Sequence, residues 1–279
     1  GRLRDLGGVE IVAGHLDDEA ALRALMAGAD AAVHLVGIIM ESGSATFERI
    51  HVAGTMRVVT AARAAGVGRF VHMSALGARA EPAASAYHRT KAAGEEAVRN
   101  GGIPHAILRP SLIAGEGSAP LRMMIDLVRF SPIVPIIGDG RYLLQPVWIE
   151  DVAEAFAVAV ERPEITGTFE IAGPDQLTWH QMVDLLEAAL AVTRRRVSVP
   201  VGIVRFAAHA GMALPELAPI SPDQLQMLIE GNTSQANAIQ TVFGIRARPF
   251  GDVARELCAP YAPTGAVRKE DGPGVSPRA

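Results

Sequence analysis

Three short apolar runs, each followed by a segment with helical spacing, constrain the fold of this chain more than any other feature. The runs cover residues 31–39, 68–74 and 105–113. The first is apolar at nearly every position, which is typical of a parallel strand buried on both faces of a sheet. Strands that alternate with helices at this spacing predict βαβ crossovers, and therefore an α/β fold with a parallel sheet.

Flanking signals place further elements in the first half. Residues 9–13 are a short alternating run and predict an additional strand before the first helix. Asp17 and Asp18 precede residues 19–27, whose apolar spacing predicts a helix with an aspartate cap. Residues 47–65 predict a long helix that ends at Gly66. The ends of the parallel strands are expected to meet at one edge of the sheet, where ligands of such folds bind.

The second half is less regular. Helices are predicted at 121–130, at 152–161 after Asp151, and at 179–191 after Thr178, with extended segments at 143–149 and 168–174. We therefore expect an α/β domain over 1–175, with segments of a second lobe inserted from about residue 115. Residues 176–261 would form mainly a small C-terminal lobe. The Gly-, Pro- and charge-rich residues 262–279 predict a disordered tail.

Composition excludes several classes of function. Apolar residues make up 49% of the 279, enough for a large core, and the formal net charge of -4 with scattered basic residues argues against nucleic-acid binding. The single cysteine, Cys258, excludes an intramolecular disulfide, and no Cys/His spacing indicates a metal site. No apolar run reaches the roughly 18 residues of a membrane span. We expect a cytoplasmic protein.

One apolar segment, 201–219, carries Arg205 and His209 at helical spacing. It is interpreted either as a lobe helix packed on the domain or as a patch that contacts the inner face of a membrane peripherally. The amphipathic helices do not fix an oligomeric state.

The candidate chemistry lies around Tyr87 and Lys91. They are four residues apart in a predicted helix, so their side chains leave the same face. A neighbouring ammonium favours the phenolate and lowers the pKa of a tyrosine from its ordinary value near ~10. Ser74, at the end of an apolar run, is placed to hold an oxygen on which negative charge develops. The alternative interpretation is a tyrosine that only packs on a helix face.

Six segments occur in the order of a known superfamily. They are Asp30-Ala-Ala-Val-His-Leu-Val-Gly, Val52-Ala-Gly-Thr, Gly66-Val-Gly-Arg-Phe-Val-His-Met-Ser74, Tyr87-x-x-x-Lys91, Leu108-Arg-Pro-Ser and Gln145-Pro-Val-Trp-Ile-Glu-Asp-Val-Ala. With them, residues 1–260 resemble the extended or atypical short-chain dehydrogenase/reductases, the NAD(P)-dependent epimerase/dehydratase-like proteins. Within this superfamily, the residues of these segments are most similar to those of the accessory subunits of respiratory complex I that resemble short-chain dehydrogenase/reductases.

The resemblance implies that residues 1–175 form an NAD(P)-binding domain with a Rossmann-type doubly wound parallel sheet that lacks its first βαβ unit, and that 176–261 form mainly a substrate lobe. It also implies an NAD(P)-dependent oxidoreductase or epimerase acting on a small organic substrate. Tyr87 would be the acid/base, Lys91 would lower its pKa and bind the nicotinamide ribose, and Ser74 would orient the reacting oxygen. The cofactor is expected to be NAD or NADP, with NADPH slightly favoured. Its expected contacts, besides Tyr87 and Lys91, are Gly14, His15, Leu16, Leu35, Val36, Gly37, Pro110 and Ser111. The expected substrate-side residues are Gln145, Val147 and Trp148.

The sequence also departs from the family pattern. His15 stands where an aspartate often accepts from the adenine amino group, and His51 stands where an asparagine is frequent. The family's first strand, Gly-rich turn, first helix and second strand have no counterpart in the sequence, so the fold is expected to be N-terminally truncated by about 40 to 45 residues. Residues 9–13 would then have no neighbouring strand, and 31–39 would form an exposed apolar edge.

Two other functions stay open from the sequence. One is a catalytically silent, NAD(P)H-binding scaffold or accessory protein linked to respiratory complex I. The other is a role in quinone metabolism, suggested only by that kinship and by the apolar segment 201–219. The presence of Ser74, Tyr87 and Lys91 together favours the enzyme.

Overall fold

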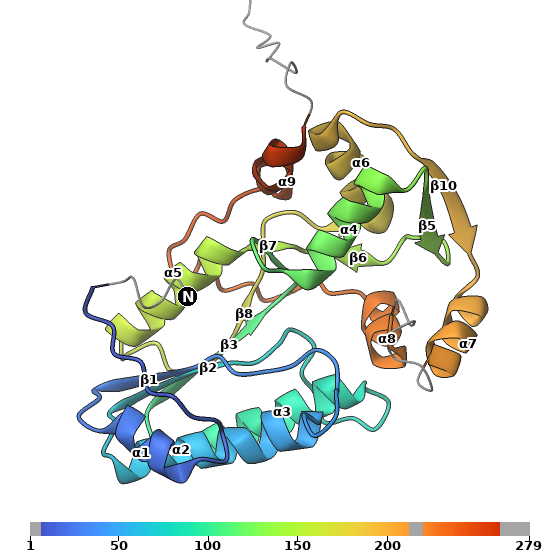
Figure 1. Ribbon diagram of the computed structural model, residues 1–279. Helices are drawn as coiled ribbons and strands as arrows, with labels where there is room; N and C mark the ends of the chain where they lie inside the picture. Colours follow the sequence, from blue (N-terminus) through green and yellow to red (C-terminus); the bar gives the residue numbers. More distant parts are fainter. Residues whose placement is uncertain (1–6, 212–219, 263–279) are drawn as a thin grey trace, which may run out of the picture.

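The computed structural model describes residues 7–211 and 220–262 and is built around a four-stranded parallel sheet (Figure 1). The strand order is β1-β2-β3-β8, with every neighbouring pair parallel. These strands are Ala31–His34, Arg69–Met73, His105–Pro110 and Gly167–Ile171. The architecture confirms the prediction of a Rossmann-like α/β fold with a parallel sheet.

Helices cover both faces of this sheet. On one face lie α1 (Glu19–Met26), α2 (Thr55–Ala64) and α3 (Ala86–Arg99), and on the other lies α5 (Ile149–Glu161). Side chains alternate along β2, because Phe70 packs with α1–α3 while Val71 packs with α5. This alternation decides which face each polar residue of the strands reaches.

The predicted helix over 47–65 is divided. Its first part, η2 (Glu48–Gly54), is a π-helix, and only Thr55–Ala64 is α-helical. A π-helical turn inside a helix often occurs at a functional site. Here it places His51 against α3, as described below.

The second half packs around its own core (Figure 1). Helices α4, α6 and α9 contribute most of this core, together with Trp148. Short strand pairs, β4–β7, β5–β10 and β6–β9, complete it. The remaining elements are β4 (Ile113–Ala114), α4 (Ala119–Phe130), β5 (Ile133–Ile137), β6 (Leu143–Leu144), β7 (Val147–Trp148), β9 (Leu177–Thr178), α6 (Trp179–Leu190), β10 (Arg195–Val199), α7 (Val201–Gly211), α8 (Pro222–Glu230), α9 (Phe250–Cys258) and the 3-10 helix η4 (Ala259–Tyr261).

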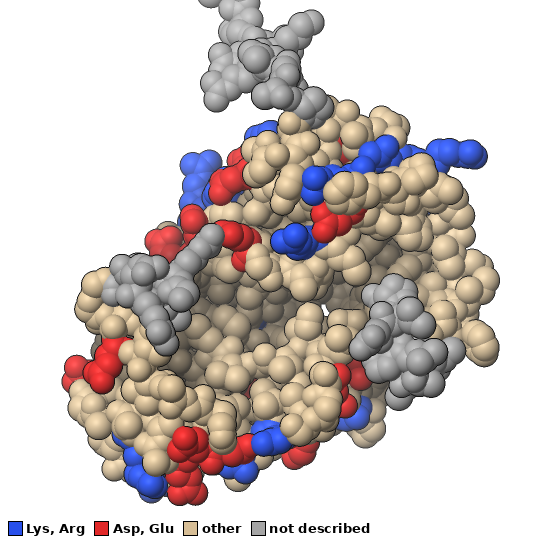
Figure 2. Space-filling view, viewed as in Figure 1, with Lys and Arg blue, Asp and Glu red and all other residues tan. Residues whose placement is uncertain are grey.

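Figure 2 shows a hollow between the layer of α1–α3 and this second half, lined in that view mostly by uncharged residues. The two halves are tied together beside it by polar contacts. The carboxylate of Asp223, on α8, accepts a hydrogen bond from the Ala86 N–H at the start of α3, 3.0 Å away. Glu230, at the end of α8, pairs with Arg79 at 2.7 Å.

The predicted strand at 9–13 does not form, and this expectation is wrong. Val9 and Ile11 are 47% and 46% exposed, and no strand within 7–211 and 220–262 pairs with this segment to satisfy its backbone hydrogen bonds. As predicted, β1 is an edge strand of the described sheet, and Val33 on it is 45% exposed.

The apolar segment 201–219 begins with helix α7, on which Ile203 and Phe206 are 60% and 77% exposed. Residues 212–219 and the tail predicted to be disordered, apart from Ala262, lie outside the described residues. Throughout 7–211 and 220–262, every helix is too short or too polar to cross a membrane.

Candidate active site

Helix α3 places four functional side chains in one row. Tyr87, Lys91, Glu95 and Arg99 follow one another at intervals of four residues and so share a face of the helix. The helix starts where the Ser85 hydroxyl accepts from the His88 N–H at 3.2 Å, a regular N-cap. The row thus begins at the capped end of α3 and continues to its last turn.

Lys91 is buried, at 4% exposure, and its Nζ donates to the backbone carbonyl of Met73 at 2.6 Å. Burial lowers the pKa of Lys91 to about 8, and the Glu95 carboxylate only partly opposes this shift. The position is notable because only two of the chain's 26 Lys and Arg residues are lysines, Lys91 and Lys269. An arginine keeps its charge in such a place, whereas a lysine can lose it near neutral pH.

Tyr87 lies in an aromatic cluster rather than against a charge. Its ring meets Phe47 and His51 edge-on, with centroids 5.8 and 5.5 Å apart. Burial raises the pKa of Tyr87 to about 12. The direction is opposite to the one that the sequence predicted, because the desolvation of the phenol dominates and the Lys91 ammonium is committed to the Met73 carbonyl. The phenol is therefore protonated at neutral pH, and it is a weaker acid than an ordinary tyrosine.

Ser74 contacts a residue that the sequence reasoning missed. Its hydroxyl donates to Glu95 Oε1 at 2.5 Å, and Glu95 has no exposed surface. The same carboxylate accepts two hydrogen bonds from Arg109, both at 2.7 Å, and one from Arg99 at 2.6 Å. Burial opposes ionisation of Glu95, but these hydrogen bonds outweigh it and lower its pKa. Since Ser74 has one proton, its predicted role toward a reacting oxygen requires this bond to break, and the role stays a prediction.

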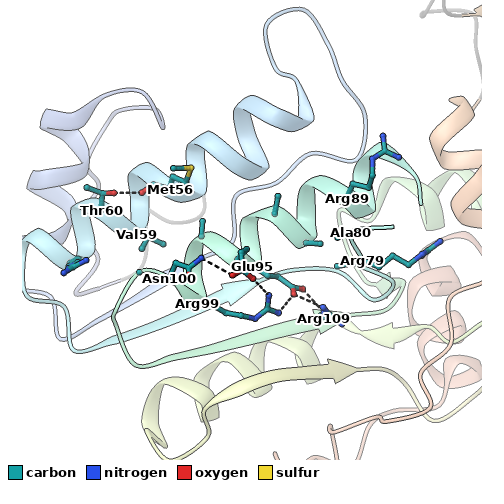
Figure 3. A pocket seen from close by; sticks show the side chains of 17 residues that line it. Met56, Val59, Thr60, Arg79, Ala80, Arg89, Glu95, Arg99, Asn100 and Arg109 are labelled. Atoms are coloured by element: carbon teal, nitrogen blue, oxygen red, sulfur yellow. Dashed lines mark hydrogen bonds and ion pairs between the residues drawn. The ribbon is translucent and has the colours of Figure 1, made fainter. Parts of the chain in front are cut away.

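Figure 3 shows this network from the outside of the molecule, where Arg99 and Arg109 converge on Glu95. They border a groove of about 870 Å³ between α2 and the outer surface of α3. Tyr87 and Lys91 do not line it. The groove therefore reaches the candidate site only through the Glu95 network.

Three histidines surround Lys91. His34 on β1 and His72 on β2 stack at 5.1 Å, and their Nδ1 atoms are 3.1 Å apart. Burial, with a further contribution from Lys91, lowers the pKa of His34 and of His51 to about 4, and lowers that of His72 as well. All three are neutral at neutral pH, so Lys91 is the only one of these four groups that carries a charge there.

The residues predicted to bind the cofactor fall into separate places. Gly14, His15, Leu16 and Val36 line a cavity of about 540 Å³ beside α1. Gly14 permits a close approach, because a Cβ there would lie 2.3 Å from that of Ala21. Gly37 adjoins the candidate site, since a Cβ on it would lie 3.7 Å from Lys91 Nζ. Leu35 is 53% exposed. Pro110 ends β3, and the Ser111 hydroxyl donates to the carbonyl of Gln145 at 2.5 Å.

The predicted substrate-side residues are engaged by the fold. Gln145 is 5% exposed, its amide donates to the Gly173 carbonyl at 2.7 Å and accepts from the Ser234 N–H at 2.9 Å. Val147 has no exposed surface and Trp148 is 4% exposed. Contact with a substrate would require rearrangement around these side chains, and their role stays a prediction.

The crossing of α3 over η2 gives a first test of this geometry. Gly94 lies three residues after Lys91 on α3, and a Cβ there would meet the His51 carbonyl oxygen at 2.6 Å. We expect Gly94→Ala to lower the free energy of unfolding by about 1 to 3 kcal/mol, because this clash outweighs the gain in helix propensity. Urea denaturation measures it.

Gly251, on α9, is the matched control. A Cβ there would make an ordinary contact of 3.6 Å with Leu185. Gly251→Ala should leave stability unchanged or raise it by up to about 1 kcal/mol. Equal effects of the two substitutions would contradict the close crossing at Gly94.

Comparison with known proteins identifies related sequences. Residues 1–172 match the model of the NAD dependent epimerase/dehydratase family. The chain is 31% identical, over 242 residues, to the mitochondrial NADH dehydrogenase [ubiquinone] 1 alpha subcomplex subunit 9 of Arabidopsis thaliana, with 85% of this chain and 59% of that protein covered. It is 33% identical, over 199 residues, to ceramide reductase of Caulobacter vibrioides, with 71% and 61% covered. The chain thus spans about 60% of the length of these relatives.

Solved structures share the fold. A nucleoside-diphosphate-sugar epimerase from Staphylococcus aureus superposes with a TM-score of 0.71 at 14% identity, covering 89% of this chain and 84% of that one. Triphenylmethane reductase from Citrobacter sp. gives 0.69 at 20% identity, covering 89% and 83%. At these identities the likeness supports the architecture alone.

Proposed function

This chain belongs to the NAD dependent epimerase/dehydratase family, and we propose that it reduces a carbonyl group of a small organic substrate with NADPH or NADH. Lys91 carries the proposal. It is a buried amine with a pKa lowered to about 8, in a chain that otherwise uses arginine almost throughout. A merely structural cation at this position would not need to be a lysine.

The described residues fit a dinucleotide in two places. The cavity of about 540 Å³ lined by Gly14, His15 and Leu16 would hold the adenine end. His15 supplies at most one acceptor there, in place of a carboxylate. At the other end, Gly37 lies against Lys91, since a Cβ on it would be 3.7 Å from Lys91 Nζ, and two of the three Lys91 N–H donors remain after the bond to Met73. These donors would bind the nicotinamide ribose.

The bound cofactor supplies the hydride for this reaction. Tyr87 holds a proton at its Oη, and in the reducing direction it gives that proton to the carbonyl oxygen as negative charge develops there. To stabilise the phenolate that this transfer leaves behind, the Lys91 ammonium would have to turn toward it from the Met73 carbonyl. Ser74 would act on the same oxygen only after releasing Glu95; otherwise it serves to hold β2 against α3.

The test is turnover. Protein is incubated with NADPH or NADH and a panel of quinones, keto-steroids and sugar nucleotides, and the loss of reduced-nicotinamide absorbance is followed. We expect at least one carbonyl compound to be reduced, and Lys91→Met to lower kcat/KM by at least about 100-fold, since it removes the ammonium at nearly constant size. Equal turnover by Lys91→Met would refute the assigned role.

A second candidate function is favoured by two observations. The Ser74 hydroxyl donates its hydrogen bond to the Glu95 carboxylate, and one relative is a subunit of NADH dehydrogenase. The protein would then bind the dinucleotide as a structural element of a respiratory assembly and turn nothing over. Tight binding of NADPH, with no change in its absorbance across the whole panel, would favour this second function.

A further inference from the structure

His51 links the backbone after β1 to the start of α3. It is 2% exposed and lies in the π-helical turn η2. Its Nε2 is 3.1 Å from the Ile38 N–H and therefore accepts that hydrogen bond. The ring proton must then be on Nδ1, which is 3.0 Å from Thr90 Oγ1. The Thr90 hydroxyl in turn donates to the carbonyl of Ala86 or Tyr87.

The ring of His51 also contacts the candidate acid directly. It stacks on Phe47 at 5.4 Å and meets Tyr87 edge-on at 5.5 Å, with 83° between the planes. The absence of a side chain at Gly94 lets η2 approach α3 closely enough for these contacts. One side chain therefore contacts both the turn after β1 and the helix that carries Tyr87 and Lys91.

The turn that His51 binds packs against Lys91. A Cβ on Gly37 would lie 3.6 Å from His51 Nε2 and 3.7 Å from Lys91 Nζ, both ordinary contact distances. The Ile38 amide is therefore the point at which this turn is fixed, next to the amine that would contact the nicotinamide ribose. Any drift of the turn would change its distance from Lys91 Nζ.

We propose that His51 is a positioning residue that fixes the turn Leu35–Ile38 against α3 and so sets the distance between the bound dinucleotide and the Tyr87–Lys91 pair. The inference rests on the proposed function for its role in the reaction, but the fixing of the turn is independent of it. A neutral imidazole is required, since protonation of Nε2 would break the bond from Ile38. Burial and, after it, the charge of the nearby Lys91 lower the pKa of His51 and keep it neutral, while the other groups that face it, His34, His72 and Tyr87, are uncharged.

Two substitutions separate the two hydrogen bonds of His51. In His51→Gln the side-chain amide reaches the position of Nε2 and can still accept from Ile38, while the bond to Thr90 is lost. In His51→Asn the amide reaches only the position of Nδ1, so the bond to Thr90 is kept and that from Ile38 is lost. His105→Gln is the control, because the His105 ring bonds to the Ile103 carbonyl at the start of β3, away from the hydrogen bonds of His51.

The first readout is hydrogen exchange of the Ile38 amide in the full chain, with thermal unfolding to verify that each variant folds. We expect exchange at Ile38 to accelerate by about 5- to 10-fold or more in His51→Asn and to stay near the native rate in His51→Gln and His105→Gln. The second readout is the Kd for NADPH, which should rise by about 5- to 10-fold in His51→Asn alone.

Unchanged exchange and unchanged Kd in His51→Asn would overturn the inference. Faster exchange in both His51 variants would overturn it as well, since the loss would then follow from the missing ring and not from the bond to Ile38. If the native protein binds NADPH but reduces nothing, the proposed function fails while both readouts still decide on His51. If it binds no dinucleotide, the exchange readout alone decides whether His51 fixes the turn.

Discussion

Tyr87→Phe is expected to lower kcat for carbonyl reduction by about 100- to 10,000-fold while changing the Kd for NADPH by less than about twofold. The substitution removes one hydroxyl and leaves the ring contacts with Phe47 and His51 in place. Because burial raises the pKa of Tyr87 to about 12, the native phenol is protonated at every ordinary assay pH. Its loss removes the proton donor without removing a charge.

The measurement is steady-state reduction of the best substrate from the panel, together with a direct binding titration of NADPH. Tyr142→Phe provides a matched control. Tyr142 is also a partly buried tyrosine, on the other half of the molecule, whose hydroxyl has no hydrogen-bond partner among the described residues. The Tyr142→Phe variant should reduce the substrate at the native rate. If Tyr87→Phe does the same, another group supplies the proton and the mechanism must be abandoned.

Glu95→Gln should produce the largest loss of stability, about 3 to 5 kcal/mol in the free energy of unfolding. The native carboxylate has no exposed surface and accepts hydrogen bonds from Ser74, Arg99 and Arg109. Glutamine has nearly the same shape but no charge, so the buried side of Arg109 would be left without a counter-ion. Its amide nitrogen would also face a donor.

The adjacent Glu96 is the control for this prediction. It too pairs with Arg99, at 3.2 Å, but its side chain is 61% exposed. Glu96→Gln should therefore cost less than about 1 kcal/mol. Urea denaturation of both variants at neutral pH measures the difference. A loss of stability in Glu95→Gln as small as that in Glu96→Gln would show that the buried network contributes little to holding α3 on the sheet.

Local pattern predicted most of the first half because each signal there is reinforced by its neighbours. The cap of α1 forms as expected, with Asp18 accepting from Ala21. The strand expected at 9–13 does not form, because an alternating apolar pattern does not produce a strand without a partner strand to pair with. In the second half, two strands could not be predicted from the apolar pattern. Strand β5 contains Pro135, and β10 begins with two successive arginines, Arg195 and Arg196. Helix α8 begins with a capping box, Ser221 with Gln224, whose residue pattern also stands in the sequence.

For the candidate site, sequence spacing placed Tyr87 and Lys91 on one face of a helix but did not give their surroundings. The face of the sheet toward which the Ser74 side chain points could have been predicted. It follows Phe70 and His72 at intervals of two, and Phe70 packs toward α1–α3, so the Ser74 side chain was due on the side of α3. Glu95 could have been found four residues after Lys91 on the same stripe. The role proposed for His51 could not have been found from the sequence, because it depends on a π-helical turn that no local pattern predicted.

The exposed edge of the described sheet at β1 affects the self-association of the protein in solution. A parallel strand with exposed apolar side chains, such as Val33, and with no neighbour on its outer side, can template the pairing of another molecule. We expect the isolated protein to self-associate as its concentration rises, and more so on warming toward room temperature, because the attraction between apolar surfaces strengthens over that range. Dilute, cold solutions are thus the conditions in which its single-molecule chemistry is best observed.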